Sequence, residues 1–272
     1  MGMRVTIFSR DEFTARFMIE GINAALANTL RRIILAEVPT MAIDDVIIYE
    51  NSSVLHDEIL ALRLGLIPIK TDLKTYNLPE KCDCKSELGC PKCRAIFTLD
   101  VEAKEGIRTV YSGDLVPEDP AIVPVSDKIP IVKLAASQRI RLEAYAKLGR
   151  GKDHAKWQPV SACVYRYKPI VRIDESRCNA CGKCVEYCPR KVLAKEGNRV
   201  FVVNEIECIL CNDCVKACNV KPAPITVSWD PSAFIFYIES VGSLPVDEII
   251  FEALKIYEEK FMEFMTLIEG VL

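Results

Sequence analysis

The chain has 272 residues, of which 50% are hydrophobic and 27% charged, and this composition is typical of a soluble globular protein with a substantial core. Its formal net charge of -3 argues against a protein whose main task is to coat nucleic acid. No apolar run reaches the roughly 18 residues that a membrane span needs, and the N-terminus lacks a signal-peptide pattern. We therefore expect a cytoplasmic protein that does not contact a membrane.

The first 50 residues predict a β-hairpin, a helix and a further strand. Residues 3–9 alternate apolar and polar side chains, as a strand does, and residues 13–19 indicate a second strand. An apolar stripe at helical spacing follows, and Pro39 stops that helix. Residues 43–49 predict the third strand. On periodicity alone the helix could be an ordinary amphipathic core helix. The residues of its apolar stripe are Leu26, Leu30, Ile33 and Ile34.

Four of the 13 cysteines lie in one short segment, residues 82–93, which we call the zinc loop. Without an export signal, so many thiols indicate metal binding rather than disulfides. Four thiolates can close the tetrahedral shell of a zinc ion and fix a loop that has little core of its own. The first pair is separated by one residue, which is tighter than usual, so a reduced loop without metal is the alternative. The candidate zinc ligands are Cys82, Cys84, Cys90 and Cys93.

The middle of the chain predicts more β-structure and a basic stretch. Residues 95–101 and 108–111 indicate two strands that pair with each other. Between residues 139 and 156 the sequence carries six cations and only two acids. A nucleic-acid contact is one interpretation. Because the whole chain is acidic, we favour a solvated face or a docking loop for an acidic partner.

An internal repeat of cysteines between residues 178 and 218 carries the strongest chemical signal. Both halves have the spacing C-x2-C-x2-C-x3-C, and the second begins 30 residues after the first. This is the spacing of bacterial-type ferredoxins with two [4Fe-4S] clusters, in which the fourth cysteine of each motif binds the other cluster. The first cysteine set is therefore Cys178, Cys181, Cys184 and Cys218, and the second cysteine set is Cys188, Cys208, Cys211 and Cys214.

Two zinc sites are the alternative for these eight cysteines. We favour iron-sulfur clusters because the repeat contains no histidine and because Pro189 follows the fourth cysteine of the first half. The second half departs from the pattern with Asn219 in that place, which bears on the assignment of Cys218. The segment between the halves predicts a hairpin that turns at residues 196–198.

The C-terminal segment predicts a strand at residues 234–238 and then a long helix that opens at Pro245. The helix keeps an apolar stripe for about six turns, roughly 35 Å. Phe251 and other apolar residues lie outside this stripe, so we expect a second protein chain to cover them. Phe261 and Phe264 are the residues of this helix that we expect at the interface.

Several segments resemble one protein family. The runs NTLRRIILAEVPTMAIDDV and VLHDEILALRLGLIPI, at residues 28–46 and 54–69, are similar to the D-type subunits of archaeal RNA polymerases. They also resemble the third-largest subunit of eukaryotic RNA polymerase II and, more distantly, the bacterial alpha subunit. Residues 129–157 and the run FIFYIESVGSLPVDEII extend the resemblance.

The resemblance implies an α+β fold in which a split dimerisation domain encloses the rest of the chain. Its two parts are residues 1–47 and 226–272, with a mostly-β insert or docking domain at 48–168 and a ferredoxin-like domain at 169–225. It also implies that the first helix lies at the dimerisation surface. The implied partners are a small L-type polymerase subunit, other small subunits and the two large subunits.

The sequence offers no catalytic machinery of its own. It has two histidines, no Ser-His-Asp order and no aspartate cluster of the kind that binds catalytic magnesium. We therefore expect a non-catalytic assembly subunit of RNA polymerase, which meets DNA and RNA only through the assembled enzyme. The alternative is a ferredoxin-type electron-transfer subunit of an oxidoreductase complex. That alternative explains residues 170–225 alone, and no flavin or nicotinamide fingerprint accompanies it.

Overall fold

The structure is a computed structural model that describes residues 2–84, 86 and 89–270. It divides into two compact units. The first contains the residues before Ser9 together with Arg16–Ala27 and Tyr165–Phe236. The second contains Ser9–Ala15, Asn28–Val164 and the residues after Phe236. The mixture of antiparallel strand pairs and a few helices confirms the predicted α+β class.

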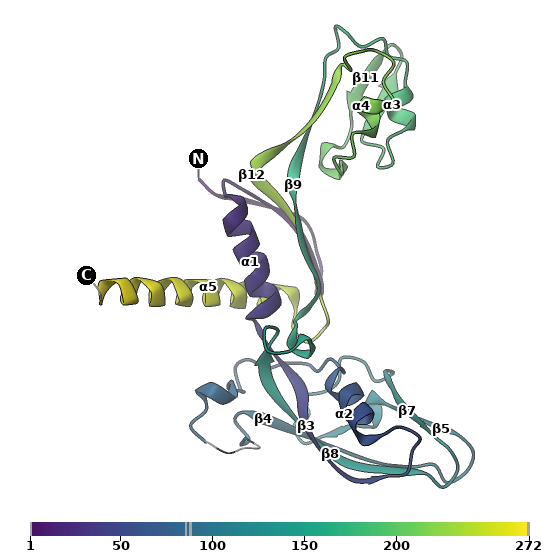
Figure 1. Cartoon of the computed structure of the whole chain (residues 1–272), viewed down its shortest axis with the longest axis vertical. Coiled ribbons are helices and arrows are strands. Elements are labelled where there is room, and N and C mark those ends of the chain that lie inside the picture. Colours follow the sequence, from purple (N-terminus) through teal and green to yellow (C-terminus); the bar gives the residue numbers. More distant parts are fainter. Residues whose placement is uncertain (1, 85, 87–88, 271–272) are drawn as a thin grey trace. The chain divides into compact units, whose positions relative to one another are not determined.

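The first unit is organised on a four-stranded sheet (Figure 1). Aromatic side chains form its core: Phe17 stacks on Phe236 with the ring centroids 5.4 Å apart, and Tyr165 meets Phe234 edge-on at 5.6 Å. The predicted strands at residues 3–9, 13–19 and 234–238 are confirmed, although the last is part of a much longer strand. In sheet order the strands are β1 (Arg4–Arg10), β2 (Thr14–Glu20), β12 (Ile225–Ser240) and β9 (Val160–Ile173).

The cysteine repeat forms a small subdomain of the first unit. Its predicted hairpin is confirmed, with Gly197 in the left-handed region at φ 56° where the chain turns. A one-turn helix follows the opening cysteines of each half. The elements are α3 (Lys183–Glu186), β10 (Leu193–Glu196), β11 (Arg199–Val202), the 3-10 turn η4 (Glu205–Glu207) and α4 (Asp213–Lys216).

The second unit holds a larger β-domain. Its main sheet has the order β3-β8-β4-β6, and a separate two-stranded sheet pairs β5 with β7. The predicted pairing of residues 95–101 with 108–111 was wrong, because β4 pairs with β8 and β6 while β5 pairs with β7. The strands are β3 (Pro39–Asn51), β4 (Arg94–Glu102), β5 (Arg108–Tyr111), β6 (Val116–Pro117), β7 (Pro130–Leu134) and β8 (Arg139–Arg150).

Among the described residues, three α-helices lie wholly or partly in the second unit. Helix α1 (Ala24–Ala36) ends before Pro39, as predicted, and Pro39 opens the edge strand β3, where proline is tolerated. Helix α2 (Asp57–Gly65) packs on β3 and β7 and buries Leu60 and Leu64 in the β-domain core (Figure 1). Helix α5 (Val246–Glu269) begins after Pro245, also as predicted. Short 3-10 turns complete this unit at η1 (Pro79–Lys81), η2 (Ser112–Asp114) and η3 (Ala155–Trp157).

The basic stretch at residues 139–156 is mostly a strand rather than a docking loop. Most of it forms an inner strand, β8, and most of its cations pair with acids of this same chain. Arg139 binds Asp100 at 2.8 Å, while Lys147 and Lys156 both contact Asp44. The positive charge of this stretch is thus largely neutralised inside the β-domain. Among the described residues, no helix combines the length and apolar character that a membrane span needs.

Candidate metal centres and partner surface

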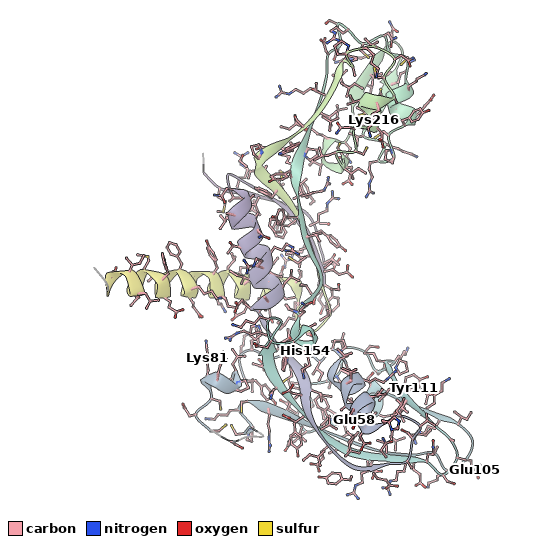
Figure 2. All side chains as sticks on the ribbon, in the orientation of Figure 1. Glu58, Lys81, Glu105, Tyr111, His154 and Lys216 are labelled. Atoms are coloured by element: carbon pink, nitrogen blue, oxygen red, sulfur yellow. The ribbon has the colours of Figure 1, made fainter. Side chains whose placement is uncertain are left out.

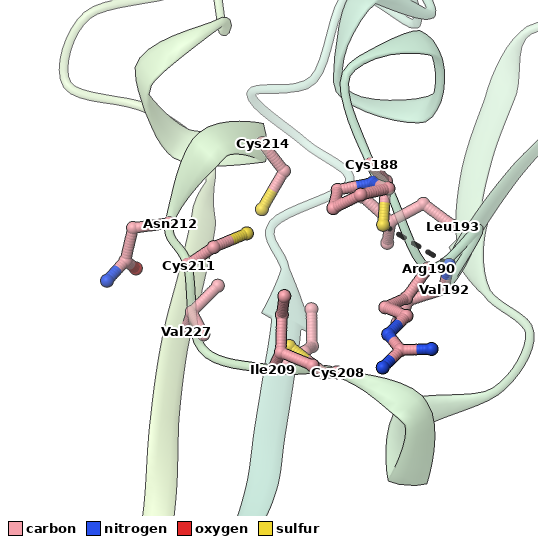
Figure 3. Close-up of a pocket in the computed structure, with 12 residues that line it drawn as sticks. Cys188, Arg190, Val192, Leu193, Cys208, Ile209, Cys211, Asn212, Cys214 and Val227 are labelled. Carbon is pink, nitrogen blue, oxygen red and sulfur yellow. Dashed lines mark hydrogen bonds between the residues drawn. The ribbon is translucent and has the colours of Figure 1, made fainter.

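The second cysteine set surrounds one cavity in the first unit (Figure 3). Cys211 and Cys214 come from α4 and the turn before it, Cys208 follows η4, and Cys188 ends the first motif. Cys208 and Cys214 are buried, and the other two are half-buried. The backbone N–H of Val192 donates a hydrogen bond to Sγ of Cys188 at 3.3 Å. The fold therefore brings together the four cysteines that the ferredoxin spacing assigns to one cluster.

The accessible wall of this cavity is otherwise almost entirely apolar, although Arg190 and Asn212 also line it. Val171 of β9 and Val227 of β12 close it from the sheet side, and Leu193 closes it from the hairpin. Burial, together with the charge of nearby cysteines, raises the pKa of the Cys214 thiol to about 11. A raised pKa means that the thiol keeps its proton at neutral pH. A bound metal ion reverses this, because a thiol that coordinates a metal is deprotonated outright. Four thiols that converge on an apolar pocket are therefore a suitable set of ligands for a metal cluster.

The first cysteine set is also drawn together. Burial raises the pKa of the Cys184 thiol, and the neighbouring charges of Cys178, Cys181 and Cys218 raise it further, so these groups lie close to it. Cys218 thus lies near Cys184 of the other half of the repeat, as the ferredoxin pattern requires. Cys184 and Cys218 are buried, whereas Cys181 is exposed.

The backbone repeats along with the cysteines. Ala180 and Leu210, each two residues after the opening cysteine of its half, have φ values of 51° and 60°. Gly182 and Asn212, two residues later, have φ values of 85° and 62°. Left-handed conformations at non-glycine residues are uncommon and are found at ligand-binding loops. Matched turns and converging thiols fit an iron-sulfur cluster at each cysteine set, and the apolar cavity fits one at the second set as well.

The zinc loop brings its four thiols within 4.8 Å of one another. The Sγ atoms of Cys82 and Cys90, and those of Cys84 and Cys93, are 3.7 Å apart. A tetrahedron with zinc-sulfur bonds of about 2.3 Å has edges of about 3.8 Å, so the spacing suits zinc. The single residue between the first two cysteines does not prevent convergence. Residues 85 and 87–88 of this loop lie outside the described residues.

The thiols of the zinc loop differ in their proton affinity. Hydrogen bonds from the backbone of Ser86 and from Cys82 lower the pKa of the exposed Cys84 thiol to about 7. Burial raises the pKa of the Cys93 thiol to about 12. Because one thiol of the loop ionises near neutral pH, a first metal-thiolate bond can form there and bring the ion to the others.

The two histidines lie outside the candidate metal sites. His154 lies at the start of η3, and its Nδ1 accepts a hydrogen bond from the backbone N–H of Lys156 at 3.0 Å (Figure 2). His56 precedes the first residue of α2. Neither belongs to the group of candidate metal ligands found among the described residues.

Helix α5 presents an apolar face that its own unit does not cover. The side chains of Phe261 and Phe264 are 55% and 57% exposed, and side chains project along the whole helix (Figure 2). Together with Ile33 and Tyr257 they line a groove between α1 and α5. Ile33 itself is buried in this chain, as is Ile34, while Leu26 and Leu30 are half-buried. The interface role of these four α1 residues stays a prediction.

The family described as the RNA polymerase Rpb3/Rpb11 dimerisation domain matches residues 16–261. The chain belongs to this family. The match begins on β2 and ends on α5, so it encloses both the β-domain and the cysteine repeat of this Rpb3/Rpb11-family member. The predicted domain boundaries after residues 47, 168 and 225 remain a prediction.

Similar proteins from archaea share nearly the full length of this Rpb3/Rpb11-family chain. DNA-directed RNA polymerase subunit Rpo3 of Methanosphaera stadtmanae is 44% identical over 260 residues, which cover 95% of this chain and 96% of the relative. Rpo3 of Archaeoglobus fulgidus is 42% identical and covers 98% of both chains. Rpo3 of Methanosarcina acetivorans is 37% identical and covers 99% of both.

Proposed function

We propose that this chain is the Rpo3-type assembly subunit of a DNA-directed RNA polymerase and that it has no catalytic site of its own. Family membership and the end-to-end similarity to Rpo3 proteins support this function. The structural observation that carries it is the groove between α1 and α5, where large apolar side chains lie uncovered. A subunit whose task is assembly needs such a surface, because exposed apolar patches of this kind mark sites of association.

The partner at this groove is a small L-type, Rpb11-like polymerase subunit. A helix with apolar residues on more than one face needs a second chain to bury them. Phe261 and Phe264 are anchors of the kind that dominate interface energetics, since aromatic side chains bury 150–250 Å² each by a rough estimate. The other small subunits and the two large subunits dock on the remaining surfaces, so DNA and RNA meet this chain through the assembled enzyme.

The two cysteine sets hold one [4Fe-4S] cluster each, and the zinc loop holds one zinc ion. When bound, the iron of each cluster bonds to four thiolates and thereby cross-links segments that are far apart in the sequence. A subdomain of this size has a small core, so these bonds supply a large share of its folding free energy. The clusters therefore act by supporting assembly.

The experiment is to change Cys181 and Cys211 to Ser, singly and together, and to co-express each chain anaerobically with its polymerase subunits. Iron content should fall by about half in each single variant and by nearly all in the double variant. Recovery of the complete polymerase should fall, while the complex with the small L-type subunit should persist because α1 and α5 lie outside the repeat. Normal yield of active polymerase from the double variant would contradict the assembly role and favour electron transfer.

A further inference from the structure

The loop that enters the second cysteine set is fastened to the sheet of the first unit. Arg166 on β9 carries a half-buried guanidinium that donates hydrogen bonds to the backbone carbonyl oxygens of Ile206 and Cys208. One of these acceptors belongs to a candidate cluster ligand. The guanidinium is planar and rigid, so two bonds from one group fix both the position and the orientation of the loop.

Two further contacts fasten the same loop, which we call the anchor loop (residues 205–208). The carboxylate of Glu205 accepts a hydrogen bond from the backbone N–H of Val171 on β9 at 2.8 Å. Glu207 forms an ion pair with Arg16 of β2 at 2.5 Å. Strands β9 and β2 lie on either side of β12, and β9 is the edge strand. The anchor loop is therefore held on two strands of the sheet at once.

The opening segment of the first cysteine set has different contacts. Arg177 donates to the backbone oxygen of Pro222 at 2.6 Å, and Arg199 pairs with Glu175 at 2.6 Å, so both contacts stay inside or beside the cysteine repeat. No side-chain hydrogen bond among the described residues joins residues 175–184 to β2 or β9. The two cysteine sets thus differ in how they are connected to the sheet.

We infer that Arg166 is a positioning residue for the second cysteine set, and that this set alone is coupled through the anchor loop to the edge strand β9. The inference rests on the proposed clusters and goes beyond their role as cross-links. When the cluster is bound, it links Cys208 to Cys188, Cys211 and Cys214. The anchor loop is then held both by the cluster, at Cys208, and by its contacts with the sheet. Without the cluster the loop gains freedom, and its contacts to β9 weaken.

The amide of Val171 reports this coupling directly. It lies on the edge strand, and its N–H is bonded to the Glu205 carboxylate. An edge-strand amide that loses its acceptor becomes accessible to solvent and exchanges its hydrogen faster. Loss of the second cluster should therefore speed exchange at Val171, while loss of the first cluster should not.

The test uses the full chain, co-purified anaerobically with its small partner, as wild type, Cys181→Ser and Cys211→Ser. Iron content and visible absorbance are measured first, followed by hydrogen-deuterium exchange of β9. Exchange at Val171 should rise by about tenfold in Cys211→Ser and change by less than about twofold in Cys181→Ser. Equal effects of the two variants would overturn the coupling. Wild-type protein without iron would overturn the proposed clusters, and the inference with them.

A second pair of variants tests Arg166 itself. Arg166→Met should speed exchange at Val171 while keeping both clusters, and Arg166→Lys should restore part of the protection. Arg166→Met should also lower the midpoint potential of one cluster only, since a nearby cation stabilises the reduced, more negative state. Arg172→Met is the matched control, because Arg172 is an exposed arginine on the same strand. If Arg166→Met left both the exchange and the two potentials at wild-type values, Arg166 would not position the cluster.

Discussion

Glu37 and Lys260 tie the end of α1 to α5 through an ion pair of 2.8 Å. Lys152, from the turn after β8, reaches the same carboxylate at 3.3 Å. The Glu37 side chain is only 17% exposed, so this is a partly buried junction rather than a loose surface pair. It lies at the groove that Phe261 and Phe264 line, and it therefore helps to fix how α5 is presented to a partner.

This junction predicts a pH dependence of stability. Burial raises the pKa of the Glu37 carboxyl, but the hydrogen bonds and charges of Lys260 and Lys152 outweigh burial, so the pKa lies below its ordinary value. A lowered pKa in the folded state stabilises the fold above the unfolded-state value of about 4.3. The contribution is lost as pH falls through the folded-state pKa.

The measurement compares wild type with Lys260→Met by urea unfolding at several pH values. At pH 7 the variant should be less stable by up to about 1 kcal/mol, since Lys260 is half exposed and its pair is screened by solvent. The difference should shrink as the pH falls below the unfolded-state pKa of about 4.3, and it should vanish below the folded-state pKa of Glu37. A difference that persisted unchanged at low pH would mean that the ionised Glu37 carboxylate is not its source.

The exposed aromatic residues of α5 predict where the partner binds. Phe261→Asp or Phe264→Asp would place an unpaired charge in a buried seam, at a cost of several kcal/mol, and should weaken binding of the small L-type subunit by at least about a hundredfold. Val54→Asp is the control, because Val54 is 78% exposed and does not line the groove. Co-elution of both α5 variants with the partner at wild-type level would disprove this interface.

An Asp substitution on α1 can affect folding as well as partner binding, depending on the residue changed. Ile33 is buried inside this chain, so Ile33→Asp would unfold part of the chain as well as disturb an interface. Leu30 is half-buried and is the better probe on that helix. The sequence predicted one apolar stripe, but periodicity alone does not say which of its residues face the chain's own core.

The sequence predicted correctly the helices that are defined by a continuous apolar periodicity and a flanking proline. Helix α1 and helix α5 have long apolar periodicity bounded by Pro39 and Pro245, and both were confirmed. The pairing of β5 was missed, because its partner β7 is separated from it in the sequence and the two short strands share no turn signal. Strand register is decided by packing between distant segments, which a single sequence does not display.

In the candidate sites, the sequence predicted the cysteine ligands but not the contacts that other residues make with distant parts of the chain. Metal ligands have a fixed spacing because covalent geometry demands it, so the cysteines stood out in the sequence. Arg166 and Glu37 did not, because their partners lie 42 and 223 residues away. Only the fold shows that Arg166 contacts the anchor loop and that Glu37 contacts α5.

The zinc loop gives a prediction of metal content. Anaerobically purified protein should contain about one zinc per chain beyond its iron, and changing Cys90 and Cys93 together to Ser should remove it. Cys163→Ser is the control, since Cys163 is a buried cysteine that belongs to no candidate site. Removal should also lower the melting temperature, because η1, at the entrance of the loop, packs on β8. Protein with no zinc in wild type would rule the site out.

The unequal exposure of the two cysteine sets predicts unequal sensitivity to oxygen. Cys181 of the first set is exposed, whereas every member of the second set is buried or half-buried. Solvent and oxidant reach exposed thiolates first, so the first cluster should be lost before the second. Of the two proposed clusters, Cys211→Ser should keep only the first and Cys181→Ser only the second, which separates their signals. On exposure to air the visible absorbance of Cys211→Ser should therefore bleach several-fold faster than that of Cys181→Ser. Equal rates would show that access to Cys181 does not limit oxidation.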